Sequence, residues 1–464
     1  MLRNLINKSS FFITKWVLIS IIFISCKTTK NSQQFTSHQP QNNQQNNEVK
    51  PNDKSDTNTL ADTLQNAHVS ICVFDASKNT FLTSYQSEKL FIPASNLKIA
   101  TCYVALKYLS DSLVGLNYIE DDTSIQIQGT ADPTFLNDNF KNQSVFNWLK
   151  TKSNKKIYLL NSKFSTTTYA QGWSWDDYLE PFMAERTSFP IYENAVTFNF
   201  SNGFKASPKY FENKIAATFE ASNNNNKFNV TRSFGSNNFA IIPGNNLTKT
   251  ITFSSEADNP VLQNRQLAQL LSDTLKLNIV SKPVYNYVLG KKVYSQLKDE
   301  VLQSMMFRSD NFIAEQLLLM VSNELFKEMD ENKLIQYLLH NDFNELPQTP
   351  RWVDGSGLSR YNLFTAQDLV FILNKMKSEF GWQRISKIFP KGNEGTLKNM
   401  FLKNSNQVYA KSGTLSNTYC LSGFLIANSG KEFIFSIMVN NHQVKTQQVK
   451  NIIENYLTAI IEKN

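Results

Sequence analysis

Cysteine is scarce in this chain, with four residues in a length of 464. Beyond the first of them the thiols are Cys72, Cys102 and Cys420, which lie far apart in the sequence. Thiols without close spacing argue against a disulfide framework and against a zinc site. We therefore expect neither a bound metal nor another cofactor.

The chain also lacks an apolar run long enough to span a bilayer. The run at residues 16–24 is too short for a stable transmembrane helix, and no later span is apparent. Arg3, Lys8 and Lys15 precede this run, which is typical of an export signal.

The apolar run leads into Ile24-Ser25-Cys26, which resembles a bacterial lipobox, although Phe23 stands where leucine is more usual. The cysteine of a lipobox is lipidated and becomes the mature N-terminus. The sequence thus predicts a lipoprotein signal peptide over residues 1–25 and a lipid anchor on Cys26. An ordinary secretory signal with an incidental cysteine is the alternative. The anchored protein is expected on the periplasmic side of the bacterial cell envelope, attached to a membrane.

Residues 26–61 contain few apolar side chains and many Asn, Gln, Ser, Thr and Lys. Such a segment cannot offset the entropy of ordering, so we expect a flexible tether. The net charge of +8 suits an acidic polymer such as the cell wall, and it suits solubility equally well. There is no arginine-rich patch with interleaved aromatic residues, so no nucleic-acid partner is expected.

The apolar pattern beyond the tether indicates a mixed α/β fold. Strands are expected at residues 68–74, 81–85, 407–412, 419–427 and 432–439. Helical spacing recurs from Ile99 to Leu109 and at residues 294–305, 311–323, 333–339, 366–376 and 447–461. We expect the two ends of the chain to share one antiparallel sheet flanked by helices, in a discontinuous domain of residues 62–115 and 282–464.

The intervening residues, 116–281, are predicted to form a β-rich inserted domain. Short strand-like runs are separated by turn-forming Asn, Gly and Pro. These runs lie at residues 124–128, 156–160, 195–200, 214–220, 239–242 and 250–253, and a helix is expected at 263–275.

Three short motifs follow one another along the chain. They are Ser95-Asn96-Leu97-Lys98, Ser309-Asp310-Asn311 and Lys411-Ser412-Gly413-Thr414. The first pattern, Ser-x-x-Lys, recurs at residues 153–156 and 295–298, and the second, Ser-x-Asn, recurs at 77–79. Of the Ser-x-x-Lys copies, only the first follows a strand and a turn and begins a helix. That setting places Lys98 one turn after Ser95, on the same face.

This ordered set resembles the motifs of penicillin-binding proteins and serine β-lactamases. With its neighbouring residues, the chain is similar to the class C low-molecular-mass penicillin-binding proteins, the D-Ala-D-Ala carboxypeptidase/endopeptidase family. The matching stretches are residues 93–98, 172–177, 193–194, 308–315, 354–360, 395–397 and 409–415. The resemblance implies a transpeptidase-like domain with an insert. The gap between the first two motifs departs from the family pattern, because it is shorter than in relatives that carry two inserted domains.

The motif residues are suited to acyl transfer by a serine. Ser95 is the candidate nucleophile, and Lys98 is its candidate base because no histidine lies in the motifs. Burial, the positive end of a helix and nearby Lys411 would lower the pKa of Lys98. Asn311 can hold Lys98 and a substrate carbonyl, and Ser309 is suited to relay a proton to the leaving amine.

The third motif is suited to bind a carboxylate. Lys411 and the hydroxyls of Ser412 and Thr414 would hold the carboxylate, with Gly413 between them. The resemblance implies that the backbone N–H groups of Ser95 and Thr414 form an oxyanion hole. The simpler alternatives are that Ser95 is only a helix cap and Lys411 only an exposed edge charge.

The sequence therefore predicts a serine DD-peptidase. It would remove the terminal D-Ala from peptidoglycan stem peptides through an acyl-enzyme on Ser95, with cleavage of cross-links as a second activity. β-Lactam antibiotics would be covalent inhibitors. The alternatives are a β-lactamase or esterase on the same fold, and a catalytically vestigial wall-binding lipoprotein.

Overall fold

The computed structural model describes residues 63–464 except 65, 201–202, 219–227, 245–247, 256–258 and 283–289. The predicted signal peptide, Cys26 and the predicted tether lie outside the described residues. Within the described part of the chain, no helix combines the length and the apolarity needed to cross a bilayer.

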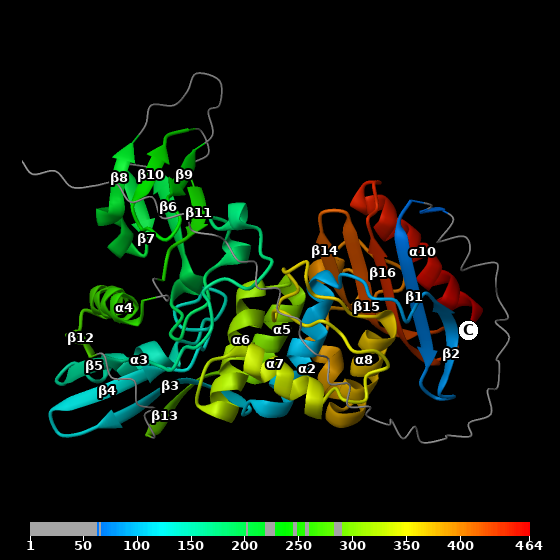
Figure 1. Cartoon of the computed structure of the whole chain (residues 1–464), viewed down its shortest axis with the longest axis horizontal. Helices are drawn as coiled ribbons and strands as arrows, with labels where there is room; N and C mark the ends of the chain where they lie inside the picture. Colours follow the sequence, from blue (N-terminus) through cyan, green and yellow to red (C-terminus); the bar gives the residue numbers. More distant parts are fainter. Residues whose placement is uncertain are drawn as a thin grey trace, which may run out of the picture. The chain divides into compact units, whose positions relative to one another are not determined.

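A five-stranded antiparallel sheet is central to the fold, with the strand order β14-β15-β16-β1-β2 (Figure 1). Its strands are β1 (His68–Asp75), β2 (Thr80–Tyr85), β14 (Val408–Leu415), β15 (Thr418–Ile426) and β16 (Glu432–Asn440). β1 pairs with β16 in continuous register from His68 with Asn440 to Asp75 with Phe433. The two ends of the described chain therefore share one sheet, as the sequence predicted.

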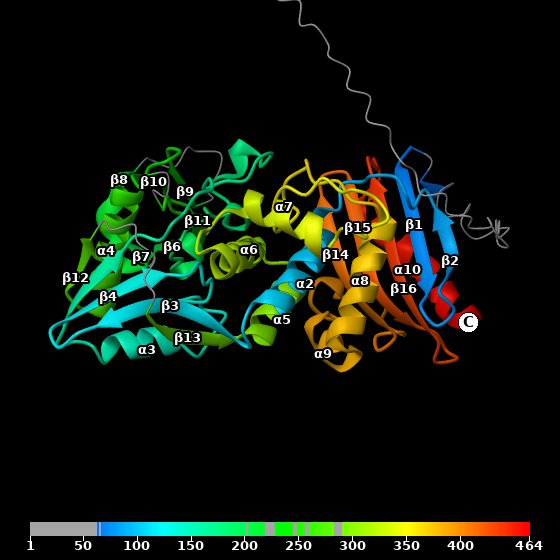
Figure 2. The same cartoon turned by 60° about the horizontal axis from the view of Figure 1, so that its bottom comes forward.

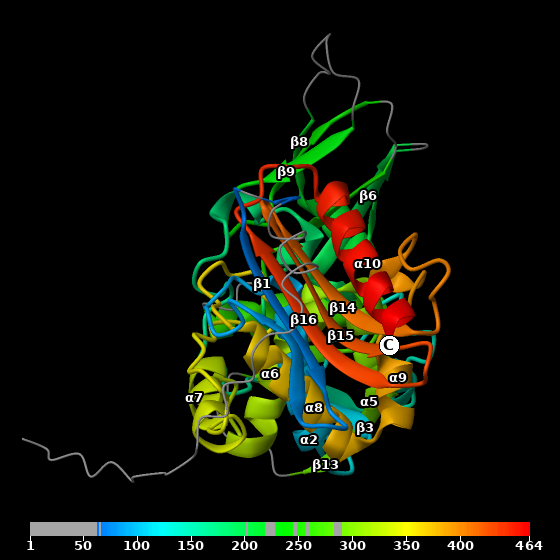
Figure 3. The same ribbon diagram turned by 90° about the vertical axis from the view of Figure 1, so that its right-hand side faces the viewer.

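Helices pack on both faces of this sheet. On one face lies α10 (Thr446–Lys463), which crosses the strands in Figure 3. The core on the other face is built with α2 (Lys98–Tyr108), α5 (Lys298–Arg308), α6 (Asn311–Phe326), α7 (Glu331–Asn341), α8 (Ala366–Phe380) and α9 (Trp382–Ile388). Successive strand residues serve opposite cores: Ile71 and Val73 pack on the α10 side, and Cys72 packs on the other.

A second five-stranded sheet has the order β12-β5-β4-β3-β13, and Figure 2 shows β4, β3 and β13 side by side. Its strands are β3 (Ser112–Glu120), β4 (Ser124–Gly129), β5 (Lys156–Leu160), β12 (Ile279–Lys282) and β13 (Lys291–Leu297). α3 (Ser144–Lys150) and α4 (Pro260–Leu275) contribute to the core of this region.

Two three-stranded sheets complete the region between β3 and β13. One contains β8 (Ile215–Thr218), β10 (Phe239–Ile242) and β9 (Asn229–Arg232), and the other contains β11 (Thr248–Thr252), β6 (Ala195–Phe200) and β7 (Phe204–Ser207). Short 3-10 turns are η1 (Ala94–Leu97), η2 (Trp175–Asp177), η3 (Pro181–Met183), η4 (Tyr192–Asn194), η5 (Lys209–Lys214) and η6 (Gly395–Leu397).

The structure corrects one predicted helix, at residues 294–305. Its first four residues belong to β13, and α5 begins only at Lys298. β13 pairs with β3, and this long-range pairing overrides the local helical spacing. β3 begins before the predicted insert of residues 116–281 and β13 lies wholly after it, yet both strands belong to the same sheet as β4, β5 and β12. The division of the chain into an insert and a discontinuous domain therefore stays a proposal.

Candidate active site

Ser95 and Lys98 lie in contact where η1 leads into α2. Lys98 Nζ donates a hydrogen bond to Ser95 Oγ at 3.0 Å, and the lysine is fully buried. The preceding residue, Ala94, has a positive φ of 48°, an uncommon conformation for a residue other than glycine. A hydroxyl beside a buried amine is the arrangement of a nucleophile with its base.

Two other acceptors fix the Lys98 amine. Nζ is 2.6 Å from Asn311 Oδ1 and 2.7 Å from the backbone oxygen of Ser356. Burial lowers the pKa of Lys98 to about 8, against the opposing effect of the carboxylates of Asp354, Asp310 and Glu315. Burial is thus the main cause of the lowered pKa, whereas the sequence-based expectation had also invoked Lys411 and the helix end.

The second motif joins α5 to α6. Ser309 follows the last residue of α5 with a φ of 56°, and Asp310 caps α6 by accepting a hydrogen bond from Ile313 N at 3.0 Å. This turn delivers Asn311 to Lys98. The other end of the Asn311 amide donates from Nδ2 to the backbone oxygen of Phe182 at 3.0 Å. Because the amide nitrogen carries two hydrogens, one remains for a substrate carbonyl.

The third motif lies on β14, the edge strand of the central sheet. Lys411 Nζ donates to Ser309 Oγ at 2.9 Å and to the backbone oxygen of Ser412 at 2.5 Å. Burial, together with the charge of Lys98, lowers the pKa of Lys411 well below its usual value. Ser412 is buried and Thr414 is exposed. The Lys411 amine is thus placed beside the hydroxyl expected to relay a proton.

β14 passes directly against the backbone of Ser95. A Cβ on Gly413 would lie 2.8 Å from Ser95 N and 2.9 Å from Pro93 O, so this approach requires glycine. Ala410 N donates to Pro390 O, on the side of β14 away from β15. Backbone groups alternate along an antiparallel strand, so the N–H of Thr414 faces the same open edge.

The loop that contains Ser356 closes the site from another side. Gly357 has a φ of 80°, and a Cβ there would lie 1.9 Å from Ala94 O, so the loop is pressed against the backbone before Ser95. This loop is therefore a tight turn next to the candidate nucleophile. Sequence reasoning missed that this turn also supplies an acceptor for Lys98, since a backbone oxygen leaves no mark in the sequence.

The two tryptophans of the 172–177 stretch behave differently. Trp173 Nε1 donates to Asp354 Oδ2 at 2.9 Å, which ties this stretch to the Ser356 loop. Trp175 is 77% exposed. The additional Ser-x-x-Lys copies have no comparable site: Ser153 lies in an exposed turn, and residues 295–298 run from β13 into α5.

Comparison with known proteins agrees with this geometry. Residues 53–460 match the model of the D-Ala-D-Ala carboxypeptidase 3 (S13) family. A curated relative, the D-alanyl-D-alanine carboxypeptidase DacB of Haemophilus influenzae, is 24% identical over 433 residues, which is 82% of this chain and 86% of the relative. A D-alanyl-D-alanine carboxypeptidase of Actinomadura sp. is 39% identical over 97 residues, covering 19% of this chain and 18% of that protein.

Solved structures show the same fold. Penicillin-binding protein 4 of Haemophilus influenzae has a TM-score of 0.69 at 20% identity, covering 87% of this chain and 99% of that one. A predatory endopeptidase of Bdellovibrio bacteriovorus, in complex with an immunity protein, has a TM-score of 0.52 at 14% identity, covering 86% and 94%. Because the family model spans nearly all of the described residues, the chain belongs to the D-Ala-D-Ala carboxypeptidase 3 (S13) family of serine-type, penicillin-binding carboxypeptidases.

Proposed function

We propose that Ser95 attacks the carbonyl of the penultimate D-Ala in stem peptides ending in D-Ala-D-Ala, with Lys98 as the base. The observation that carries this proposal is the 3.0 Å contact between Lys98 Nζ and Ser95 Oγ. The Ser95 proton passes to Lys98 as Oγ bonds to the carbonyl carbon, and the bond to the terminal D-Ala then breaks. Water hydrolyses the resulting ester and releases the shortened peptide.

The surrounding groups have separate roles in this step. The N–H groups of Ser95 and Thr414 stabilise the negative charge that develops on the carbonyl oxygen. Ser309, in contact with Lys411, passes a proton to the leaving amine. The free hydrogen of the Asn311 amide orients the substrate.

The residues of the third motif hold the free C-terminal carboxylate. Lys411 supplies the charge, Ser412 and Thr414 supply hydroxyls, and Gly413 allows the strand to approach Ser95. A bound carboxylate raises the pKa of Lys411. The charged Lys411 then repels a charge on Lys98 and favours the neutral form that accepts the serine proton.

Cleavage of peptide cross-links is proposed as a second activity. A cross-link differs from the terminal D-Ala-D-Ala only in the leaving group beyond the scissile bond, and the acyl half of the reaction is the same. The solved relative from Bdellovibrio, itself described as an endopeptidase, supports this extension.

The test of the proposal is release of D-Ala from a stem pentapeptide, together with analysis of the fragments released from purified sacculi. We expect D-Ala from the wild type and none from Ser95→Ala. Ser153→Ala is the matched control, because it alters an exposed serine of another Ser-x-x-Lys copy. Undiminished release by Ser95→Ala would refute the proposed nucleophile.

A β-lactamase on the same fold is distinguished by the fate of the penicillin adduct. A DD-peptidase keeps the penicilloyl-enzyme for a long time, whereas rapid hydrolysis with repeated turnover would favour a β-lactamase. Binding to sacculi without any release of D-Ala over hours would favour the wall-binding alternative.

We further propose a lipid anchor on Cys26, which would hold the enzyme on the periplasmic side of a membrane. The lipobox-like residues 23–26 after an export signal support this proposal. Cys26→Ser should give an exported, active protein that no longer fractionates with membranes. Failure of the wild type to incorporate radiolabelled palmitate would rule the anchor out.

A further inference from the structure

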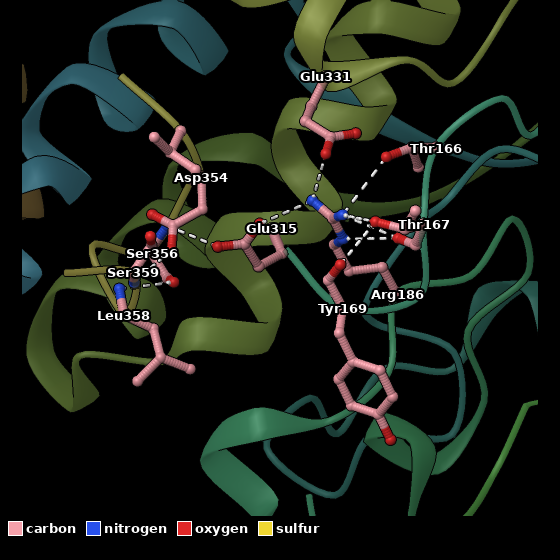
Figure 4. A network of polar contacts seen from close by, with 12 residues as sticks. Thr166, Thr167, Tyr169, Arg186, Glu315, Glu331, Asp354, Ser356, Leu358 and Ser359 are labelled. Atoms are coloured by element: carbon pink, nitrogen blue, oxygen red, sulfur yellow. Dashed lines mark hydrogen bonds and ion pairs between the residues drawn. The ribbon is translucent and has the colours of Figure 1, made fainter. Parts of the chain in front are cut away.

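A fully buried arginine lies between two carboxylates behind the active site. Arg186 Nη1 is 2.9 Å from Glu331 Oε1 and 3.5 Å from Glu315 Oε2. Nε and Nη2 donate to the backbone oxygen of Thr167 at 3.1 Å and 2.8 Å, and Nη2 also lies 3.3 Å from the hydroxyl oxygens of Thr166 and Thr167. Figure 4 shows the guanidinium between these partners. This planar fork is therefore held in one orientation.

Glu315 connects this arginine to the catalytic loop. Its Oε1 accepts a hydrogen bond from Ser356 N at 2.8 Å, and Figure 4 shows Glu315 lying between Arg186 and the loop. The backbone oxygen of the same Ser356 accepts the Lys98 amine at 2.7 Å. Three consecutive contacts thus lead from Arg186 to Lys98.

The segment that carries Arg186 runs along the helix that begins with Asn311. The backbone oxygen of Phe182 accepts from Asn311 Nδ2 at 3.0 Å, and Thr187 N donates to Gln316 Oε1 at 3.1 Å. Asn311 and Glu315 are one helical turn apart and share a face of α6. Residues 182–187 therefore support both Asn311 and Glu315.

We propose that Arg186 is a positioning residue for Lys98. By pairing with Glu315 it fixes the loop of residues 354–359, whose Ser356 oxygen holds the Lys98 amine beside Ser95. The inference rests on the proposed role of Lys98 as the base, and Arg186 itself touches neither Ser95 nor Lys98.

The charged groups around Lys98 determine in which direction a substitution shifts its pKa. Asp310 faces it from the N-cap of α6, Glu315 from one helical turn beyond Asn311, Asp354 from the loop, and Lys411 from β14. Burial and Asp354 raise the pKa of Glu315 to about 7, while Arg186 lowers it and so favours the ionised form. Ionised Glu315 in turn raises the pKa of Lys98.

The test compares Glu315→Gln with Glu331→Gln. Both substitutions keep the side-chain shape and remove one carboxylate from Arg186, but only Glu315 contacts Ser356. The second-order rate constant for acylation by a neutral thioester is measured against pH, with the melting temperature of each variant. In Glu315→Gln the acid limb of this pH profile, where the rate constant falls at low pH, should move to lower pH by roughly one unit. The reason is that Lys98 loses one nearby negative charge, which lowers its pKa.

Glu331→Gln should leave the position of the limb unchanged even if it lowers the melting temperature. Coincident limbs for the two variants would overturn the proposal. Failure of the wild type itself to acylate at Ser95 would instead refute the proposed function, so the two failures are distinguishable.

A double-mutant cycle tests whether Arg186 acts through Glu315. Arg186→Gln should slow acylation about tenfold or more, because small displacements of a base reduce the rate strongly. In the Glu315→Gln background the same substitution should have an effect at least about threefold smaller. Arg186→Lys keeps the positive charge, so the acid limb of its acylation profile should lie at the same pH as that of the wild type. This variant provides the test if Arg186→Gln does not fold. The proposal would be overturned if Arg186→Gln slowed acylation equally with and without Glu315→Gln. It would also be overturned if the acid limb of Arg186→Lys lay at a different pH from that of the wild type.

Discussion

Lys98 and Lys411 are two buried amines whose positive charges oppose each other. Three carboxylates favour the charged form of Lys98, whereas burial and the charge of Lys98 both oppose a charge on Lys411. In the free enzyme Lys411 is therefore the more readily deprotonated of the two. A substrate carboxylate beside Lys411 reverses this order, because it stabilises the charge there.

This exchange of charge between Lys411 and Lys98 predicts that the pH dependence of acylation differs between substrates. Lys98 acts as a base only when neutral, so acylation should fall as the pH drops below its pKa of about 8. A carboxylate-bearing substrate charges Lys411 and lowers the pKa of Lys98, so its acid limb should lie at lower pH than that of a neutral thioester. The maximal acylation rate at saturating substrate measures this, because it reports the bound state. Identical limbs for the two substrates would contradict the exchange.

Lys98→Arg tests the base directly. Arginine keeps the positive charge but is not deprotonated in a protein, so acylation should fall by about 10²–10⁴-fold. The variant should be compared with the wild type for labelling by fluorescent penicillin and for melting temperature. Near-normal labelling would exclude Lys98 as the base and point to a route through water.

Lys411→Ala tests recognition of the carboxylate. Loss of a charged hydrogen-bond partner should weaken binding by about 1.5–3 kcal/mol, roughly ten- to a hundredfold. Acylation by carboxylate-bearing substrates should therefore fall far more than acylation by a neutral thioester or amidated analogue. Both substrates use the same Ser95 and Lys98, so damage to the fold cancels in the comparison. Equal losses would mean that Lys411 acts on the catalytic groups alone.

The residues at and behind the candidate active site differ in how far the sequence could predict them. Ser95 and Lys98 lie one turn apart, so local spacing was enough to pair them. Arg186 and the Ser356 oxygen are different, because their contacts join segments far apart in the chain. Glu315 lies within a matching stretch, and the available signal for a buried ion pair was a carboxyl group between the apolar runs 312–314 and 317–321.

The edge strand β14 owes its place beside Ser95 to Gly413, which makes a specific prediction. In Gly413→Ala the new Cβ would contact backbone atoms that cannot move easily, so β14 must shift away from Ser95. We expect acylation to fall about a hundredfold, the order associated with a displacement of about 1 Å. Fluorescent penicillin labelling measures the loss.

Gly430→Ala is a suitable control for this substitution. Gly430 lies in the turn between β15 and β16, where a Cβ meets no atom within 4 Å. Its φ of 84° is unfavourable for alanine, so some loss of stability is expected but little loss of acylation. Equal acylation losses in the two variants would mean that general destabilisation, rather than the strand position, explains the effect.

Strands and helices with a clear alternating or helical pattern were predictable, because their tertiary contacts favour the same conformation as the local sequence pattern. The residues of β5 and β10 have the predicted bounds, whereas the last four residues of β13 were predicted to begin a helix. In β13 the pairing with β3 decides the conformation, and that partner lies far away in the sequence.

At the scale of the whole described chain, buried polar contacts join residues between β4 and β6 to α6 and α7. Arg186 pairs with Glu315 of α6 and Glu331 of α7, and Gln316 of α6 donates to the backbone oxygens of Ala131 and Thr187. Composition alone could separate a β-rich region from a helical one, but it carries no information on these contacts. Residues between β3 and β13 therefore contribute buried contacts to the helix that carries Asn311 and Glu315.

Mapping the penicillin adduct tests the central claim most directly. Purified protein is incubated with fluorescent penicillin, and the intact mass and the labelled peptide are determined by mass spectrometry, with Ser153→Ala as control. The account predicts one covalent adduct, located on Ser95, which persists and is absent from Ser95→Ala. An adduct on another residue, or undiminished labelling of Ser95→Ala, would contradict it.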